Sequence, residues 1–138
     1  MNERIAIVAT SWYKEEMLDR MVSLAEETVK KENGVLIKTV RVPGSFDIPI
    51  VVKKLLEQKD VDGVVTLGAL IQGETHHDVA IMNAVAPALT QLSLQYNKPV
   101  VLGINGPRMT LSQGMKRAER AGEVTKACIE LVRTMRML

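Results

Sequence analysis

The chain has 138 residues, of which 46% are hydrophobic and 25% are charged, a balance that suits one compact domain over residues 1–138 with a core of its own. Its 18 basic and 16 acidic residues give a formal charge of +2 and are scattered along the chain, which disfavours nucleic acid as a partner. No apolar run approaches the roughly 20 residues of a membrane span, and no presequence pattern opens the chain, so no membrane association is expected.

Apolar runs rich in β-branched residues alternate with longer segments of helical periodicity. Strands are predicted over residues 4–10, 35–42, 62–68 and 99–104. Helices are predicted over residues 15–31, 47–58, 76–96 and 110–137. The run at 35–42 alternates and is expected at a sheet edge, whereas the other three strands are apolar enough to be buried on both faces.

Two residues refine the predicted helices. Pro87 lies inside the third helix, where the loss of a backbone donor costs about 3 kcal/mol or bends the chain, so a bend or break is predicted near Ala84. Thr110 is followed by Gln113 at the spacing of a capping box, which predicts the start of the last helix. Connections of this length imply parallel strands, so the predicted fold class is α/β, a flavodoxin-like three-layer α/β/α sandwich with a four-stranded parallel sheet.

The number and spacing of the cysteines indicate the redox environment of the chain and argue against a structural metal site. Cys128 is the single cysteine and cannot form an internal disulfide, and no spacing of cysteine and histidine builds a structural zinc site. The sequence therefore predicts no metal and a reducing, cytoplasmic location.

Open parallel sheets bind ligands beyond the carboxyl ends of their strands. Polar and aromatic residues that are scarce elsewhere gather in the segments that follow the predicted strands. These segments are TSWYKE (10–15), VPGSFDIP (42–49), GALIQGETHHD (68–78) and GINGPRMT (103–110). This concentration predicts a binding site at that end of the sheet.

Both histidines of the chain open the third predicted helix, in GETHHD. The free N–H groups and positive dipole end of such a helix attract an anion, and phosphate is the natural guest. His77 could move protons near neutral pH and Asp78 could orient it, although for an isolated histidine pair a solvated first turn is the more frequent interpretation. Zinc is disfavoured because adjacent histidines point in different directions on a helix and no third ligand has usable spacing.

The other segments each allow two interpretations. Trp12 and Tyr13 could stack on a planar heterocycle, or they could plug the core. The corner at residues 43–45 could present backbone N–H and C=O groups to a ligand, or it could be an ordinary turn before a helix. Arg117 and Arg120 lie one turn apart and could hold a phosphate, or they could face solvent.

Taken in order, these segments resemble the lumazine synthase family over nearly the entire chain, in a form similar to the archaeal one. SWYK resembles a short aromatic motif of the family, with Tyr13 in the aromatic place and Trp12 where arginine is common. VPGSFDIP matches the pattern Val-Pro-Gly-small-Phe-acid-Ile/Met-Pro, with Asp47 where bacterial members usually carry glutamate.

The second half of the chain carries two further matches. LGALIQGETHHD is similar to a Gly-x-Thr-x-His segment and places the family's catalytic histidine at His77 rather than His76. TLSQGMKRAERAG resembles a Gln-x-x-x-Arg-Ala helix, with Arg117 as the phosphate-binding arginine. Arg120 is displaced from the place of a second basic residue, and Leu102 stands where many bacterial members have phenylalanine.

The resemblance implies condensation of 5-amino-6-ribitylamino-uracil with 3,4-dihydroxy-2-butanone 4-phosphate to 6,7-dimethyl-8-ribityllumazine, the penultimate step of riboflavin biosynthesis. It implies no metal or organic cofactor, and a homo-oligomer, a pentamer or a sixty-subunit shell, with active sites between subunits. His77 would be catalytic and Tyr13 would stack on the pyrimidine, with Trp12 as the alternative. The implied substrate-binding residues are Trp12, Tyr13, Gly44, Ser45, Phe46, Asp47, Leu70, Ile71, Glu74, Thr75, Leu102 and Arg117.

Three other interpretations compete with this one. The related archaeal riboflavin synthase would dismutate two lumazines, but the Gly-x-Thr-x-His segment disfavours it. A non-catalytic flavin or lumazine-binding module would share both the sheet and a pyrimidine pocket, and stays open. A receiver-like module is disfavoured because the segments after the first and third strands lack the acidic residues that it needs.

Overall fold

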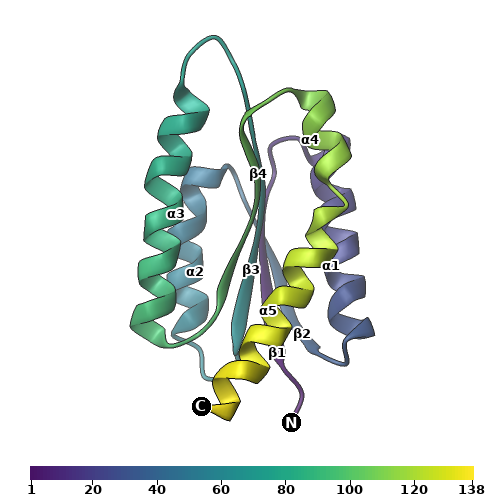
Figure 1. The fold of residues 1–138 in the computed structure, drawn as a ribbon, viewed down its shortest axis with the longest axis vertical. Coiled ribbons are helices and arrows are strands. Elements are labelled where there is room, and N and C mark those ends of the chain that lie inside the picture. Colours follow the sequence, from purple (N-terminus) through teal and green to yellow (C-terminus); the bar gives the residue numbers. More distant parts are fainter.

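Four parallel strands form the central sheet of the structure, a computed structural model that describes residues 1–138 (Figure 1). They are β1 (Arg4–Thr10), β2 (Val35–Val42), β3 (Gly63–Ile71) and β4 (Val100–Met109). The strand order is β2-β1-β3-β4, with each neighbouring pair parallel, so β2 lies at an edge as predicted. The predicted fold class, a flavodoxin-like three-layer sandwich, is confirmed.

Helices cover both faces of this sheet, as Figure 1 shows. One face carries α1 (Asp19–Lys31), α4 (Leu111–Arg117) and α5 (Arg120–Met137), and the other carries α2 (Ile48–Leu56) and α3 (His77–Tyr96). Successive residues of β1 point to opposite faces, so Ile5 and Ile7 enter the core beneath α1 and α5, while Ala6 and Val8 enter the core beneath α2 and α3. The central strands are apolar throughout because both of their faces are covered.

The last predicted strand differs from the prediction in burial and in length. It was expected to be buried on both faces, but β4 is an edge strand, and Leu102 in its centre is 44% exposed. The strand also continues to Met109 through a bulge. Ala69 of β3 pairs with Asn105 and Ile71 pairs with Met109, so residues 106–108 have no partners on β3 and bulge out of the strand.

Two helix predictions have different outcomes. Thr110 Oγ1 accepts the backbone N–H of Gln113 at 3.2 Å, and Gln113 Oε1 accepts that of Thr110 at 3.0 Å, so the predicted capping box is confirmed. The single helix predicted over 110–137 is instead divided into α4 and α5 by a turn at residues 118–119.

The break predicted near Ala84 is wrong, because α3 runs without interruption through Pro87 from His77 to Tyr96. Proline at this position removes one donor, the one that would bond to the carbonyl of Asn83 one turn earlier. Pro87 and Asn83 both lie on the exposed side of the helix, where water can bind that carbonyl. The helix therefore tolerates the proline without a break.

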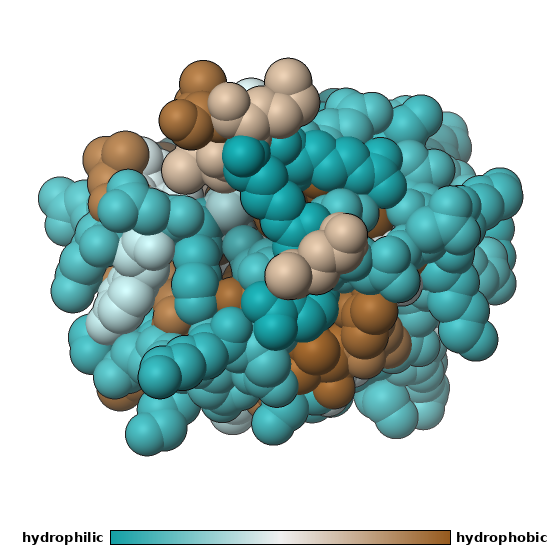
Figure 2. Space-filling model, turned by 90° about the horizontal axis from the view of Figure 1, so that it is seen from below, coloured by the Kyte–Doolittle hydropathy of each residue, from teal (hydrophilic) through white to brown (hydrophobic).

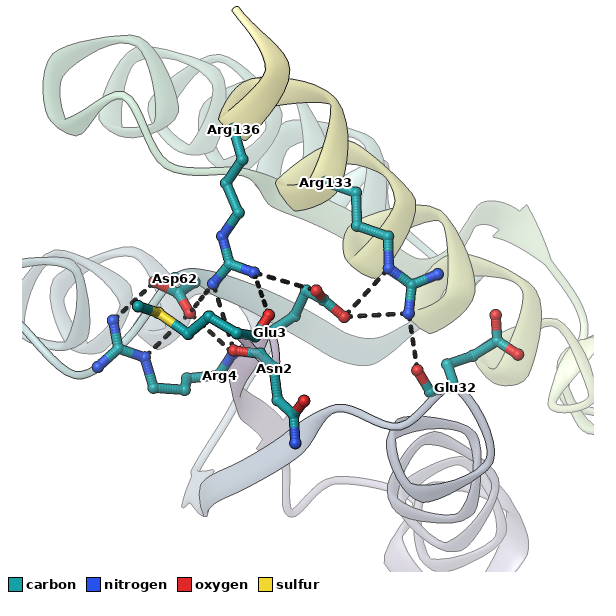
Figure 3. A network of polar contacts seen from close by, with 8 residues as sticks. Asn2, Glu3, Arg4, Glu32, Asp62, Arg133 and Arg136 are labelled. Atoms are coloured by element: carbon teal, nitrogen blue, oxygen red, sulfur yellow. Dashed lines mark hydrogen bonds and ion pairs between the residues drawn. The ribbon is translucent and has the colours of Figure 1, made fainter.

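Charged side chains join both chain termini to the sheet at the amino ends of the strands, as Figure 3 shows. Glu3, whose side chain is only 8% exposed, pairs with Arg133 and Arg136, each at 3.0 Å. Asp62, just before β3, accepts hydrogen bonds from Arg136 at 3.0 Å and from the Arg4 guanidinium at 3.0 and 3.1 Å. Figure 2 shows that this end of the molecule is largely hydrophilic.

The network also sets the protonation of one of its carboxylates. Burial by itself would raise the pKa of Asp62, but the hydrogen bonds from Arg4 and the charges of Arg4 and Arg136 outweigh that effect and hold the pKa below its usual range. Asp62 therefore stays ionised into the acidic range, and its ion pair with Arg136 holds the end of α5 against the sheet.

Candidate active site

A cavity of about 470 Å³ lies beyond the carboxyl ends of β1, β2 and β3. It lies at the end of the molecule opposite the two termini, and its walls combine apolar, aromatic and polar groups. The predicted site residues that line it are Trp12, Tyr13, Gly44, Ser45, Phe46, Leu70, Ile71, Thr75 and His77. Segments far apart in the sequence thus meet in one cavity.

Four of the predicted residues do not line the cavity. Asp47 and Glu74 are exposed nearby, in the loops after β2 and β3. Leu102 lines a separate small crevice between β4 and α5, together with Arg120. Arg117 is exposed in the last turn of α4. Leu102 on β4 and Arg117 on α4 therefore both lie outside the cavity.

The chain after β1 brings the two aromatic rings to the cavity. The N–H of Ser11 donates to Val42 O at 2.8 Å and that of Trp12 donates to Pro43 O at 3.4 Å, so pairing with the β2 segment continues past the strand. Tyr13 then adopts the left-handed conformation, with φ 60°, and the π-helix η1 (Lys14–Leu18) leads into α1. The Tyr13 ring packs partly against the core beneath α1 and α5, whereas Trp12 is 66% exposed.

The chain after β2 forms a tight corner beside Trp12. Gly44 has an extended backbone, and a Cβ placed on it would lie 3.4 Å from Trp12 Cδ1. The N–H of Gly44 donates to Asp47 Oδ2 at 2.9 Å, so this oxygen is paired within the corner. The other carboxylate oxygen of Asp47 has no hydrogen-bond partner in the chain. The 3₁₀ helix η2 (Ser45–Asp47) then leads into α2.

Two buried hydroxyl groups without partners lie at the base of this corner. Ser45 is 5% exposed and lines the cavity, yet its Oγ has no hydrogen-bond partner, and the same is true of Thr10 Oγ1 at the end of β1. A Cβ on Gly68 of β3 would come within 2.8 Å of Ser45 Oγ. Only glycine at this position therefore leaves room for the serine side chain. Buried hydroxyls are normally satisfied, so the absence of a partner for these two distinguishes the base of the corner from the rest of the core.

The start of α3 forms the opposite wall of the cavity. Thr75 Oγ1 accepts the N–H of His77 at 3.3 Å, and the exposed His77 side chain lines the cavity. Gly73 lines the cavity, has open space around it and has no positive φ, so its backbone is accessible from the cavity. The helix dipole and the N–H groups of this turn that remain unpaired favour a bound anion.

Asp78 is not a solvated residue of the first turn. It is buried, and its Oδ2 accepts the backbone N–H of Arg108 at 2.7 Å, from the bulge of β4. This hydrogen bond outweighs the opposing effect of burial and holds the pKa of Asp78 below its usual range. Arg108 has a φ of 60° and Gly106 a φ of 105°, so the bulge has an unusual backbone that Asp78 helps to hold.

Two residues of the cavity were not predicted from the sequence. Ile81 lies one turn after His77 on α3, and this i, i+4 spacing is the signal that could have identified it. Ala69 comes near the end of β3, within a strand that is apolar throughout, so no sequence signal separates it from the core.

The described residues contain no cluster of three or more histidine, cysteine, aspartate or glutamate side chains that could hold a metal ion. Burial raises the pKa of the Cys128 thiol to about 12, which keeps it protonated and unreactive. None of the helices combines the length and the apolarity needed to cross a membrane.

Comparison with known proteins agrees with the arrangement of these segments. Residues 2–136 match the family model described as 6,7-dimethyl-8-ribityllumazine synthase. A protein of that name from Picrophilus torridus is 46% identical over 121 residues, which cover 87% of this chain and 85% of the relative. One from Methanopyrus kandleri is 40% identical over 135 residues, 98% of this chain and 95% of the relative. The chain belongs to the 6,7-dimethyl-8-ribityllumazine synthase family.

Proposed function

We propose that the chain catalyses the condensation of 5-amino-6-ribitylamino-uracil with 3,4-dihydroxy-2-butanone 4-phosphate, which yields 6,7-dimethyl-8-ribityllumazine, water and inorganic phosphate. This is the penultimate step of riboflavin biosynthesis. The observation that carries the proposal is the common cavity, in which an aromatic pair, the corner at residues 43–45 and a histidine at a helix start meet. Membership of the family supports the same reaction.

The geometry supports a division of the cavity between the parts of the substrates. The aromatic pair Trp12 and Tyr13 provides ring faces for the pyrimidine and its substituents. Backbone groups at Gly44, Ser45 and Phe46 bind the hydroxyls of the ribityl chain, because desolvated hydroxyls need partners. Asp47 approaches the same chain through its second carboxylate oxygen.

The phosphate of 3,4-dihydroxy-2-butanone 4-phosphate binds at the opposite wall of the cavity, at the start of α3. Its place is the turn at residues 73–75, where backbone N–H groups at the start of α3 can donate to it. Leu70 and Ile71 form the apolar surface between the ring and the phosphate. His77 then lies between the two substrates and moves protons during imine formation, loss of phosphate and ring closure. The cavity contributes chiefly by holding the two substrates together.

We further propose that the active site is completed by a neighbouring subunit. Leu102 on β4 and Arg117 on α4 belong to the implied site, but neither lines the cavity. An edge strand with an exposed leucine is suited to cover a neighbour's cavity, and Arg117 then faces the phosphate. This arrangement requires a homo-oligomer, a pentamer or a sixty-subunit shell. We place the enzyme in the cytoplasm, where a lone buried thiol such as Cys128 stays reduced.

A two-substrate assay on the native particle tests the proposal. Mixing the purified protein with both substrates should produce the absorbance and fluorescence of 6,7-dimethyl-8-ribityllumazine and release inorganic phosphate. The lumazine alone should give no riboflavin, which separates this activity from riboflavin synthase. Binding of lumazine without turnover of the substrates would contradict the proposal and indicate a storage module. Light scattering of the same sample gives the number of subunits.

A further inference from the structure

The placement of Trp12 shows that its indole is a wall of the cavity and not a plug of the core. Its backbone is held by the hydrogen bond to Pro43 O, at 3.4 Å. Its Cδ1 and Nε1 lie 3.4 and 3.7 Å from the point where Gly44 would carry a Cβ. Trp12 lines the cavity and is 66% exposed, so its side chain is accessible to a ligand. The indole therefore stands over the corner at residues 43–45.

The relative orientation of the two rings assigns them to different parts of a ligand. The Trp12 and Tyr13 ring centroids are 6.3 Å apart, and the ring planes are inclined at 49°. A flat heterocycle that stacks on one of these rings cannot be parallel to the other. Tyr13 is partly held by the core beneath α1 and α5, which makes it the more rigid platform for the flat ring. Trp12 is left to contact whatever the corner at residues 43–45 binds.

The chemistry of the indole suits a sugar alcohol. Its face packs against the C–H groups of a flexible polyol, and its Nε1–H can donate to a hydroxyl. No group of the chain accepts a hydrogen bond from Nε1, so this donor is free for a ligand. Gly44 lies directly beside the indole, because a Cβ at that position would already be in van der Waals contact with Trp12 Cδ1 at 3.4 Å.

We propose that Trp12 is a specificity-determining residue that binds the ribityl chain, while Tyr13 stacks on the ring. The inference rests on the proposed function, because the ribityl chain belongs to the substrate named there. Trp12 would then favour ligands that carry a polyol substituent over ligands that lack one, whereas a general hydrophobic contact would not distinguish them.

The test compares two lumazines that differ only at position 8. Equilibrium dialysis with 6,7-dimethyl-8-ribityllumazine and with 6,7,8-trimethyllumazine gives the dissociation constant of each for the native protein, Trp12→Leu and Trp12→Phe. Trp12→Leu should weaken binding of the ribityl compound by about 10-fold and that of the trimethyl compound by less than about 2-fold. Trp12→Phe keeps a ring and loses the N–H, so it should weaken binding of the ribityl compound by about 3-fold.

The outcomes separate this inference from the proposed reaction. Equal weakening of both lumazines by Trp12→Leu would assign Trp12 to the ring and overturn the inference, and so would no weakening of either. Turnover is measured separately on the native protein, so a protein that binds the ribityl compound through Trp12 without turnover would contradict the reaction alone. Since Trp12 is exposed, both variants should keep the thermal unfolding midpoint of the native protein.

Discussion

The carboxylate of Asp78 and the backbone N–H of Arg108 join the first turn of α3 to the bulge of β4 at a distance of 2.7 Å. Asp78 directly follows His77, which lines the cavity, so this hydrogen bond holds the helix start that carries the proposed catalytic histidine. The positive φ of Arg108 belongs to the same junction. We therefore expect Asp78 to act as a positioning residue through its hydrogen bond to the backbone of the bulge.

Replacement of Asp78 should reduce turnover by removing this connection. Asp78→Ala is expected to lower kcat by about 10-fold, because small displacements of a catalytic group are enough to slow a positioned reaction. Asp78→Asn keeps an oxygen that can accept from Arg108 N and should retain most of the activity. Rates of lumazine formation measure both variants. If Asn were as damaging as Ala, the charge of Asp78 and not its hydrogen bond would be the essential property.

His77 should be the more important histidine. His77→Ala is expected to lower kcat by about 10²-fold or less, since a general acid or base contributes on that scale while substrate orientation survives. His76→Ala is the matched control, because His76 precedes α3 and does not line the cavity, and it should stay close to the native rate. A larger loss for His76→Ala in the same assay would transfer the catalytic role to that residue.

Arg117 should act mainly on the phosphate substrate. Arg117→Ala is expected to raise the KM for 3,4-dihydroxy-2-butanone 4-phosphate by about 10-fold, which is the usual effect of losing a charge-assisted hydrogen bond. The KM for 5-amino-6-ribitylamino-uracil should change little. An unchanged KM for the phosphate substrate would remove Arg117 from the site.

A mixing experiment tests whether the site is shared between subunits. Native active sites should form when His77→Ala and Arg117→Ala chains are unfolded together and reassembled in equal amounts. Random assembly places a native His77 opposite a neighbour's native Arg117 in about a quarter of sites, so activity should rise above that of either variant alone. Activity that merely averages the two variants would mean that each site lies within one subunit.

The network around Asp62 should make the protein sensitive to acid. Because hydrogen bonds and charges of Arg4 and Arg136 lower the folded pKa of Asp62, the ionised form stabilises the fold above the unfolded pKa of about 4, and this contribution is lost as the pH falls through the lowered folded value. Urea unfolding between pH 7 and pH 3 should therefore show falling stability at the acid end. Asp62→Asn should lower stability at neutral pH and flatten the acid dependence, and an unaltered dependence would contradict the role of Asp62.

The sequence by itself determined the layers of this protein. The apolar runs at 4–10 and 35–42 have the bounds of β1 and β2, and the Thr110 capping box was readable because it depends on residues three apart. The motifs also indicated which loops carry the site, because the ends of parallel strands lie at one edge of a sheet. These features are local or follow from the order of the elements.

Tertiary structure decided what depends on contacts between distant residues. The position of β4 at an edge left Leu102 exposed, although its apolar sequence predicted burial on both faces. The bond from Arg108 to Asp78 spans 30 residues and arises only because a bulge in β4 meets the start of α3. The position of the Trp12 indole beside Gly44 likewise depends on the pairing of β1 with β2. Periodicity and propensity describe neighbours along the chain, whereas strand order and register set these longer contacts.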